Sequence, residues 1–346
     1  MILTGDCRDI LPTLDAESID CCVTSPPYAL GLRNYGNIPN QIGLEATLEE
    51  YIETIRDVFR EVHRVLKPEG TLWLNLGDKY AKSGPAGNGY PNGKNKPAGA
   101  DIVPMKQPYP DKCLMLVPAR VAIALIDDGW ILRNEIIWAK TNPLPSSAPD
   151  RCNNSHESIY LFGKSDQKKY LQTSSEETMF LFAKQPKYYF DQDSIAEPAS
   201  TNDQRQPVGS KGTVGHPNAG LRNKIGGNKF PGKVSTTYSG NPFIPSGTRI
   251  KRDVWTLSTA ASENQREEIE HYAKYPEALV KPCILAGCPA GGTVLDPFSG
   301  SGTTGKVAHD LGREYIGIEL NPAYAEASKK RIGAHLQTLL SLRLTK

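Results

Sequence analysis

Apolar and polar positions follow two periods along this chain. Between residues 48 and 66, apolar side chains recur every three or four positions, which predicts a helix with one buried face. Thr47 and Glu50 supply a capping box at its start, and residues 67–70 are expected to end it. Further helices are expected at residues 117–128, 276–287, 303–311 and from 321 onward.

Short apolar runs between these helices predict strands. They cover residues 1–3, 19–24, 71–76, 130–138, 292–298 and 314–320. Residues 157–164 and 177–184 resemble each other, and both are expected to be strands. Because helices and strands alternate, the sequence indicates an α/β fold with a largely parallel sheet.

Two glycine-rich stretches interrupt this pattern. Residues 83–110 hold five glycines and six prolines, which predicts a long irregular loop. Residues 199–252 hold nine glycines, nine basic residues and one acid, a local charge of +8. A solvated flexible loop and a nucleic-acid-binding segment both explain that charge. We expect a mobile insertion outside the core.

Composition excludes several classes of protein. Hydrophobic residues make up 38% of the chain and charged residues 23%, which is typical of a globular protein, and the net charge of +2 says little about partners. No apolar run reaches the roughly 20 residues that a membrane span needs. The seven cysteines include no Cys-x-x-Cys pair, so neither a metal site nor a disulfide framework is expected. A reducing cytoplasm is the expected location.

A glycine loop near the carboxyl end carries the first chemical signal. Residues 294–305 read as a strand, a tight turn containing Gly300 and Gly302, and the start of a helix. The helix N-terminus offers backbone N–H groups to an anionic group. Glu319 follows Gly300 by 19 residues, a spacing at which an acid reaches ribose hydroxyls. No phosphate-loop lysine follows the glycines, so the pattern predicts an adenosine-bearing cofactor without an essential phosphate contact.

The second signal is a proline turn after the strand 19–24. Pro26 and Pro27 remove two backbone donors and fix two φ angles, so nearby carbonyls point outward from a stiff frame. The Ser25 hydroxyl and the Pro26 carbonyl can then accept hydrogen bonds from an exocyclic base amine, a poor nucleophile whose lone pair is delocalised. Tyr28 offers a ring on which an extruded base can stack.

Together these motifs resemble the DNA amino-methyltransferases of the permuted β arrangement, in which the proline motif precedes the cofactor loop. The similarity lies in residues 24–28 and 296–303, and extends to 5–7, 271–276 and 317–320, and to 138–143 with Arg151 and Glu157. It implies a Rossmann-like, doubly wound, mostly parallel seven-stranded sheet and S-adenosyl-L-methionine as cofactor. The catalytic residues that it implies are Ser25, Pro26, Pro27 and Tyr28. The cofactor-binding residues that it implies are Asp6, Cys7, Thr24, Tyr275, Pro276, Asp296, Pro297, Phe298, Gly300, Gly302, Thr303, Glu319 and Leu320.

The resemblance also implies how the chain is divided. Residues 1–141 and 253–346 form the catalytic domain, with 83–112 as an inserted loop. Residues 142–252 hold the last core strands and a target-recognition region, which includes the basic segment 199–252. The partner is double-stranded DNA, and a homodimer and a cognate restriction endonuclease stay open. The expected DNA-binding residues are Arg33, Lys140, Asn142, Arg151, Arg205, Lys211, Arg222, Lys224, Arg249, Lys251 and Arg252.

The target base and the activity leave alternatives. In the resembling family, serine before the prolines goes mostly with cytosine N4, and aspartate or asparagine with adenine N6, so cytosine N4 is favoured. Methylation at cytosine carbon 5 needs a thiolate, and Cys283 is expected to be a buried small residue instead. RNA or protein amide methylation and a non-catalytic DNA-binding module are further readings. The intact proline turn and glycine loop argue against the last of these.

Overall fold

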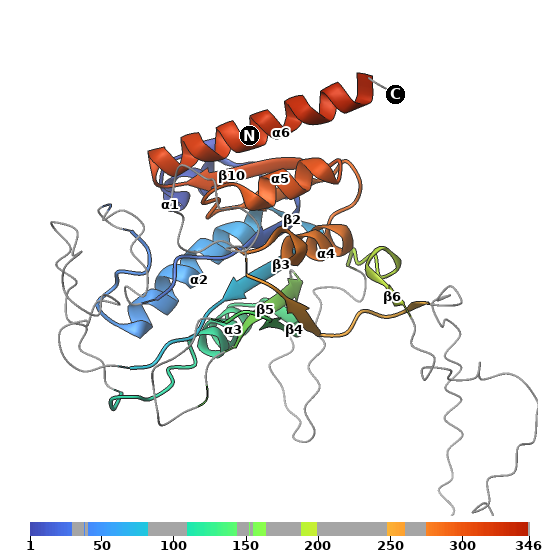
Figure 1. Ribbon diagram of the computed structural model, residues 1–346. Helices are drawn as coiled ribbons and strands as arrows, with labels where there is room; N and C mark the ends of the chain where they lie inside the picture. The colour runs from blue at the N-terminus through green and yellow to red at the C-terminus, as the bar shows by residue number, and fades with distance from the viewer. Residues whose placement is uncertain are drawn as a thin grey trace, which may run out of the picture. The chain divides into compact units, whose positions relative to one another are not determined.

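The computed structural model describes residues 1–29, 38, 41–81, 109–143, 152, 155–163, 188–198, 248–259 and 275–344 (Figure 1). The chain divides into two compact units. The larger unit consists of Met1–Ile195 and Arg252–Lys346, and the smaller consists of Ala196–Lys251. Residues 83–108 of the expected loop 83–110 and the second predicted strand, 177–184, lie outside the described residues.

The larger unit is built on one sheet of eight strands. In spatial order these are β1 (Ile2–Thr4), β10 (Glu314–Glu319), β9 (Thr293–Asp296), β2 (Ile19–Thr24), β3 (Leu66–Leu76), β5 (His156–Gly163), β4 (Ile131–Lys140) and β8 (Val254–Leu257). All neighbouring pairs are parallel except the two that β5 makes with β3 and β4. The predicted doubly wound, mostly parallel sheet is therefore confirmed.

The sheet holds one strand more than the seven expected. The additional strand is β8, whose four residues pair with β4 at the edge of the sheet. Such a short segment, between a glycine-rich stretch and a polar one, carries too few positions to show a period of two. Pairing with β4 makes this segment a strand. At the start of the pairing, the Ile137 backbone N–H donates a hydrogen bond of 2.7 Å to the Asp253 carbonyl.

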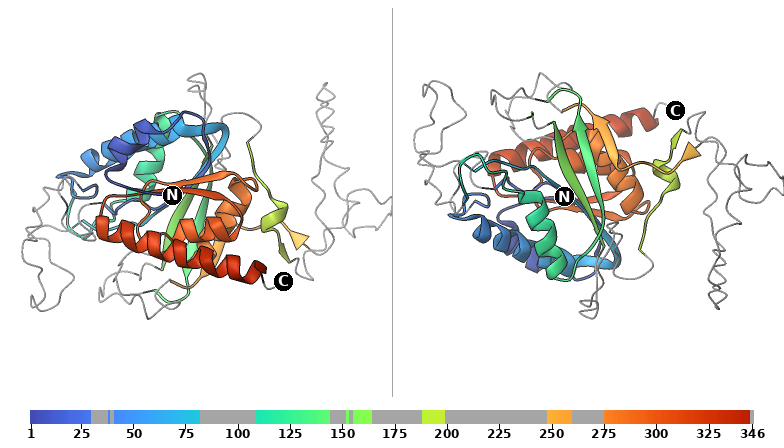
Figure 2. Two further views of the ribbon diagram at one scale, coloured as in Figure 1. Left: turned by 90° about the horizontal axis from the view of Figure 1, so that it is seen from above. Right: turned by 90° about the horizontal axis from the view of Figure 1, so that it is seen from below.

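Helices cover both faces of the sheet, as the two views in Figure 2 show. On one face lie α1 (Cys7–Ile10), α2 (Leu48–Val65) and α3 (Val117–Asp127), and on the other α4 (Glu277–Gly287), α5 (Thr303–Asp310) and α6 (Pro322–Leu344). Alternate residues of β3 enter the two cores. Leu72 and Leu74 pack with α2, whereas Trp73 packs with α4. This alternation follows from the period of two in a strand.

The predicted capping box of α2 is confirmed. The Thr47 hydroxyl accepts from the Glu50 backbone N–H at 3.1 Å, and the Glu50 carboxylate accepts from the Thr47 N–H at 3.2 Å. Helix α2 ends at Val65, directly before the predicted stop at residues 67–70, but β3 begins at once with Leu66 and not at residue 71 as expected. Leu66 pairs with Ile19, and Lys67 forms an ion pair of 2.8 Å with Asp20, so the neighbouring strand extends β3 through these residues.

The other helices and strands lie close to their predicted positions. Helix α4 starts after Pro276, and α5 and α6 follow the glycine loop and β10 as expected. Cys283 is the buried small residue that was predicted, and its thiol donates to the Leu279 carbonyl. In the smaller unit, β6 (Glu197–Pro198) and β7 (Thr248–Arg249) pair antiparallel. The division into domains by function stays a prediction.

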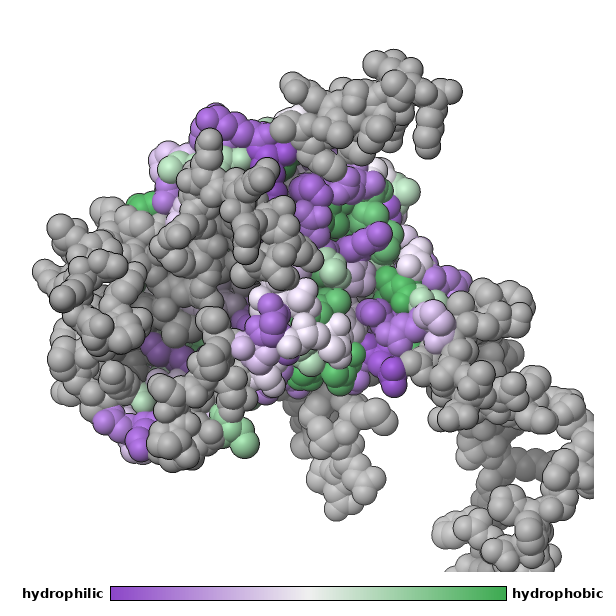
Figure 3. Space-filling view, viewed as in Figure 1, coloured by the Kyte–Doolittle hydropathy of each residue, from purple (hydrophilic) through white to green (hydrophobic). Residues whose placement is uncertain are grey.

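No helix of the described residues is both long enough and apolar enough to cross a membrane. Helix α6 has 23 residues, yet Glu326, Lys329 and Lys330 are exposed along it. Figure 3 shows hydrophilic residues gathered over the first turns of α6. The outer side of α6 up to residue 333, where its side chains are described, is therefore largely polar.

The end of α4 lies directly against β3. A Cβ atom added at Gly287 would lie 2.4 Å from Trp73 Nε1 and 2.5 Å from Thr71 Oγ1, and both side chains are buried. The same threonine donates a hydrogen bond of 3.2 Å to the Gly287 carbonyl. Only glycine permits this close packing of helix on sheet.

We expect Gly287→Ala to lower the free energy of unfolding by about 1–3 kcal/mol, because an added methyl group overpacks a rigid core. Thermal unfolding followed by calorimetry measures the effect. Gly333→Ala in α6 is the matched control, since no described atom lies within 4 Å of a Cβ added there. It should leave stability unchanged or raise it through helix propensity. Equal melting temperatures for wild type and Gly287→Ala would contradict the packing argument.

Candidate active site

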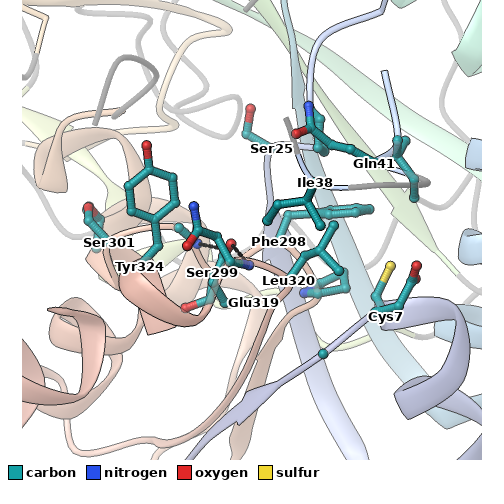
Figure 4. A pocket seen from close by; sticks show the side chains of 18 of the residues that line it. Cys7, Ser25, Ile38, Gln41, Phe298, Ser299, Ser301, Glu319, Leu320 and Tyr324 are labelled. Carbon is teal, nitrogen blue, oxygen red and sulfur yellow. Dashed lines mark hydrogen bonds between the residues drawn. The ribbon is translucent and has the colours of Figure 1, made fainter. Parts of the chain in front are cut away.

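A cavity opens at the carboxyl ends of β1, β10, β9 and β2. Its empty volume is about 880 Å³, including the open mouth. From β9 the chain continues through α5 to β10, and from β2 through α2 to β3, on opposite faces of the sheet. The cavity thus lies at the topological switch point, where doubly wound sheets bind ligands. Figure 4 shows its lining side chains converging from these elements.

Most of the predicted cofactor residues line this cavity. They are Asp6, Cys7, Tyr275, Pro297, Phe298, Gly300, Thr303, Glu319 and Leu320, together with the predicted catalytic residues Ser25 and Pro27. Burial raises the pKa of the Cys7 thiol to about 12, so this side chain offers a neutral wall and not a thiolate. These residues come from five separate segments of the sequence that the fold brings together.

The glycine loop turns sharply between β9 and α5. Gly302 has φ of +78°, and a Cβ atom there would lie 2.2 Å from Ser328 Oγ of α6. The loop therefore needs glycine for its conformation and for the approach of α6. Helix α5 starts at the next residue, so its free N–H groups and positive dipole end border the cavity at Thr303.

Glu319 braces this loop from the end of β10. Its two carboxylate oxygens accept backbone hydrogen bonds from Gly300 at 2.7 Å and from Asn321 at 2.8 Å. Burial raises the pKa of this carboxyl above its ordinary value of 4.5, although both N–H groups oppose that shift. Each oxygen keeps a second lone pair, so the side chain can also accept hydrogen bonds from the hydroxyls of a ligand.

Asp296 is not among the residues that line the cavity, and its role as a cofactor contact stays a prediction. Its carboxylate is fully buried and accepts hydrogen bonds from Thr24 Oγ1 (2.6 Å), Thr304 Oγ1 (2.7 Å), Tyr275 Oη (3.2 Å) and the Phe298 N–H (3.1 Å). Burial raises its pKa above the ordinary value of 3.8. The carboxylate therefore joins the end of β2 to the glycine loop and holds the cavity wall in place.

Thr24, Pro276 and Gly302 are likewise absent from the described lining of the cavity. Thr24 is the buried donor to Asp296, and Pro276 is the buried residue that precedes the first turn of α4. Gly302 shapes the loop from behind. Their roles in the structure are to support the residues that face the cavity.

The proline turn borders the cavity through Ser25 and Pro27, but the side chain of Tyr28 points away from the cavity. The Pro27 carbonyl accepts a hydrogen bond of 3.0 Å from Tyr51 Oη, which fastens the turn to α2. Tyr28 is only 9% exposed, and its hydroxyl donates to Glu157 Oε2 at 2.9 Å. Its ring lies against Gly77, where an added Cβ would approach it to 3.1 Å. Pro26 is buried, and neither Pro26 nor Tyr28 lines the cavity, so the expected open stacking face is not seen.

Beside this turn lies a polar cluster of which the family resemblance had pointed to Lys140 and Glu157, but not to Asn75. Glu157 accepts hydrogen bonds from Tyr28 Oη, from Asn75 Nδ2 at 3.1 Å and from the ammonium group of Lys140, with which it forms an ion pair. Asn75 also donates to Ser25 Oγ at 3.4 Å. The strand ends that carry these residues were predicted, but their pairing across β3, β5 and β4 was not.

The predicted DNA-binding residues have different surroundings. Lys140 is 19% exposed, pairs with Glu157 and lies 4.7 Å from the centre of the Trp138 ring. The Asn142 side chain is bonded to Thr259, and Lys251 pairs with Glu197 inside the smaller unit. Arg249 lies in β7, and Arg252 accepts at its carbonyl from Trp255 Nε1. The predicted residues outside the described part of the chain are Arg33, Arg151, Arg205, Lys211, Arg222 and Lys224.

Two residues that line the cavity but were not predicted from the sequence, Ile38 and Gln41, bear on whether an adenosine-bearing molecule fits. Ile38 joins Phe298 and Leu320 as apolar wall, which suits the faces of a planar base. Gln41 is 6% exposed, and its Oε1 atom has no hydrogen-bond partner among the described residues. A buried acceptor in a cavity calls for a ligand donor or water. An apolar slot, an orphaned acceptor, a carboxylate and a helix N-terminus together fit a nucleoside that carries an amino acid group.

No group of three or more potential metal ligands occurs in the part of the chain that the structure describes. A doubly wound sheet with a glycine loop at its switch point, an acid at the end of the next strand and an antiparallel strand, β5, inserted between β3 and β4 is the fold of the class I methyltransferases.

Comparison with known proteins gives the family. The model of the DNA methylase family, which covers N6 and N4 methyltransferases, matches residues 19–330. The type II methyltransferase M.SmaI of Serratia marcescens is 38% identical over 331 residues, 96% of this chain and 90% of that protein. M.Cfr9I of Citrobacter freundii is 34% identical and covers 96% of this chain and 87% of its own length. This chain belongs to the DNA methylase family.

Solved structures show the same fold. The PvuII DNA methyltransferase, described as cytosine-N4-specific, superposes with a TM-score of 0.57 over 98% of this chain and 92% of its own, at 19% identity. A putative modification methylase of Thermus thermophilus, solved with S-adenosyl-L-methionine, gives 0.51 over 96% and 93%, at 20% identity.

Glu319 should leave a signature in the pH dependence of stability. Its pKa is raised on folding, so between pH 4.5 and the raised value the folded chain binds more protons than the unfolded chain. The free energy of unfolding contributed by this group falls as pH rises through that window. We expect Glu319→Gln to remove this decline, as denaturant titrations across the window can measure. Glu326→Gln, an exposed change of the same type, is the control, and identical profiles for Glu319→Gln and wild type would refute the assignment.

Proposed function

We propose that this DNA methylase transfers a methyl group from S-adenosyl-L-methionine to N4 of a cytosine in a specific double-stranded DNA sequence. The observation that carries the proposal is Ser25, which stands at the head of the proline turn and lines the cofactor-sized cavity. Two features support cytosine. The residue before the prolines is serine, and the similar PvuII enzyme is described as cytosine-N4-specific.

The cavity residues provide for each part of the cofactor. Glu319 can accept from ribose hydroxyls, the α5 N-terminus at Thr303 suits the carboxylate of the methionine part, and Ile38 with Phe298 and Leu320 suits the adenine. The Gln41 Oε1 atom remains for an amine donor. When bound, this cofactor supplies an electrophilic methyl group on a sulfonium sulfur.

The protein's own task is to make a weak nucleophile reactive. The cytosine amine shares its lone pair with the ring, and acceptors around its two N–H groups draw that pair out of conjugation. Ser25 Oγ and the Pro26 carbonyl are such acceptors on a turn that Tyr51 fastens to α2. The surplus proton is acidic only after the methyl group is in place, so no strong base is needed beforehand. The rigid turn therefore contributes preorganised electrostatics.

Adenine N6 is the alternative target. Both bases present an exocyclic amine to the same acceptors, so the turn itself accommodates either. A flipped base of either kind would have to reach the turn beside the cavity.

The identity of the base can be read from DNA. Expression in a host without DNA methylases, nuclease digestion and mass analysis of the nucleosides should give N4-methylcytosine. Ser25→Ala should lower kcat by about 10²-fold, the effect of losing one preorganised hydrogen-bonding group. Affinity for S-adenosylmethionine, measured by calorimetry, should stay within about twofold of wild type. N6-methyladenine as product would overturn the choice of base, and full activity of Ser25→Ala would overturn the role of the turn.

DNA binding is proposed to use the basic segment 199–252, whose described end includes Lys251 and Arg252. Each phosphate contact contributes about 0.9 to the slope of log affinity against log salt concentration. Replacing both residues by glutamine should therefore reduce that slope by about 1.8, measured by fluorescence anisotropy with a duplex. Lys329→Gln with Lys330→Gln, on exposed α6, removes the same charge elsewhere and should leave the slope unchanged. An unaltered slope in the first pair would contradict a role in DNA binding.

Three expectations go beyond these tests and stay predictions. They are a homodimer, a cognate restriction endonuclease as companion activity, and a cytoplasmic location at the nucleoid. The type II names of the similar methyltransferases from S. marcescens and C. freundii support the second.

A further inference from the structure

We infer that Arg331 is a positioning residue for the cofactor, and that from α6 it holds the hydroxyl groups of Ser301 and Thr303 so that their hydrogens face the carboxylate of S-adenosyl-L-methionine. The inference rests on the proposed function in one respect, the placement of that carboxylate at the start of α5. Arg331 belongs neither to the glycine loop nor to the proline turn, and it is not among the described residues that line the cavity. Its contacts with the loop carry the inference.

Helix α6 packs directly on the glycine loop. A Cβ atom added at Gly302 would lie 3.3 Å from Ile332 Cδ1 of this helix. Arg331 precedes Ile332, and its side chain is 20% exposed. Its Nη1 atom donates to the Ser301 hydroxyl at 3.3 Å, to the Ser301 carbonyl at 3.5 Å and to the Thr303 hydroxyl at 3.4 Å. The guanidinium group thus bridges the two residues on either side of Gly302.

A carboxylate on α4 holds the guanidinium group from another side. Arg331 Nη2 forms an ion pair of 3.1 Å with Glu277 Oε1, and Lys306 Nζ forms one of 2.7 Å with Glu277 Oε2. Glu277 is the first residue of α4, and Lys306 lies in α5. Side chains of three helices therefore meet at this carboxylate, and the Nη1 end of the guanidinium group is turned toward the glycine loop.

Hydrogen bonds from Arg331 determine what the two hydroxyl groups can do. A guanidinium group only donates, so Ser301 Oγ and Thr303 Oγ1 act as acceptors toward it and keep their own hydrogens. Neither hydroxyl donates to another residue within the described structure. Both residues line the cofactor cavity, where Figure 4 shows the Ser301 side chain. Two O–H donors are therefore available to a ligand at this end of the cavity.

A carboxylate is the ligand group that suits these donors. It only accepts hydrogen bonds, and the N-terminus of α5 adds backbone N–H groups and the positive end of the helix dipole. Hydrogen bonds to a charged acceptor are stronger than those between neutral groups. The guanidinium group places a positive charge behind both hydroxyls. In the proposed cofactor the methionine part alone carries a carboxylate, since the adenine and the ribose have no negative charge.

The test measures the binding of two ligands by calorimetry, without DNA. S-adenosylhomocysteine carries the amino acid group, and 5′-methylthioadenosine has the same nucleoside without it. Arg331→Met removes the charge and the donors but keeps a long unbranched side chain. We expect it to weaken the binding of S-adenosylhomocysteine about tenfold. The binding of 5′-methylthioadenosine should stay within about twofold of wild type. A general loosening of the glycine loop would weaken both ligands alike, so equal losses would overturn the positioning role.

A variant without the hydroxyl groups, Ser301→Ala with Thr303→Val, shows whether Arg331 acts through them. It should also weaken the binding of S-adenosylhomocysteine about tenfold. Adding Arg331→Met to it should have little further effect, because the groups that Arg331 positions are gone. Multiplying losses would mean that the charge acts by a separate route, and they would overturn the positioning role.

Lys330→Met is the matched control. Lys330 precedes Arg331 on α6, is exposed and carries the same charge. Its replacement should leave both affinities unchanged, which separates the effect of Arg331 from a general loss of positive charge on the helix. If Arg331→Met does not fold, the variant without hydroxyl groups still tests the inference, since wild-type affinity for S-adenosylhomocysteine there would overturn it.

Steady-state kinetics and the modified nucleoside separate this inference from the choice of base. Arg331→Met should raise the KM for S-adenosylmethionine about tenfold and leave kcat within about twofold, because the carboxylate is bound alike in the ground state and the transition state. N6-methyladenine as product, with the ligand affinities as expected, would overturn cytosine as the target and leave the inference standing. N4-methylcytosine, with equal losses for the two ligands, would overturn the inference and leave the proposed function intact.

Discussion

The buried carboxylate of Asp296 is the interaction on which the site depends. It joins Thr24, at the end of β2, to Thr304 and Phe298 of the glycine loop, although Thr24 and Asp296 are 272 positions apart in the chain. Such a carboxylate is costly to bury unless several donors surround it. The donors come from both sides of the switch point, so the two strands and the loop are stable only together. These bonds fix the position of the proline turn, which follows β2, relative to the cofactor cavity.

A second carboxylate plays a corresponding part at the mouth. Glu157 collects donors from β3, β4 and the proline turn, and so connects the antiparallel edge of the sheet to Ser25 through Asn75. Asp296 lies buried behind the cofactor cavity, and Glu157 lies beside the proline turn. The site is thus held between two carboxyl groups whose partners include residues of β2, β3, β4, the proline turn and the glycine loop. This arrangement suits a reaction in which the positions of donor and amine, and not a strong base, determine the rate.

Much of the fold was predictable because its signals are local. The capping box of α2, the glycine turn before α5 and the strand that ends at Thr24 depend on residues close together in sequence. The prediction of strand bounds failed where pairing with a segment distant in sequence determines the structure. The extension of β3 through residues 67–70 depends on β2, and the edge strand β8 depends on β4. The orientation of Asp296 and Tyr28 also depends on neighbours that no local pattern reveals.

The sequence by itself determined the class of sheet, the order of its motifs and the residue types that the chemistry needs, since each is encoded in a short stretch. The tertiary structure alone decided which of those side chains face the cavity and which support it. It directed Asp296 inward, covered Tyr28 and brought Asn75, Glu157 and Lys140 beside Ser25. The physical reason is that buried polar groups must find partners, and in this fold the partners lie on strands that are adjacent in space and distant in sequence.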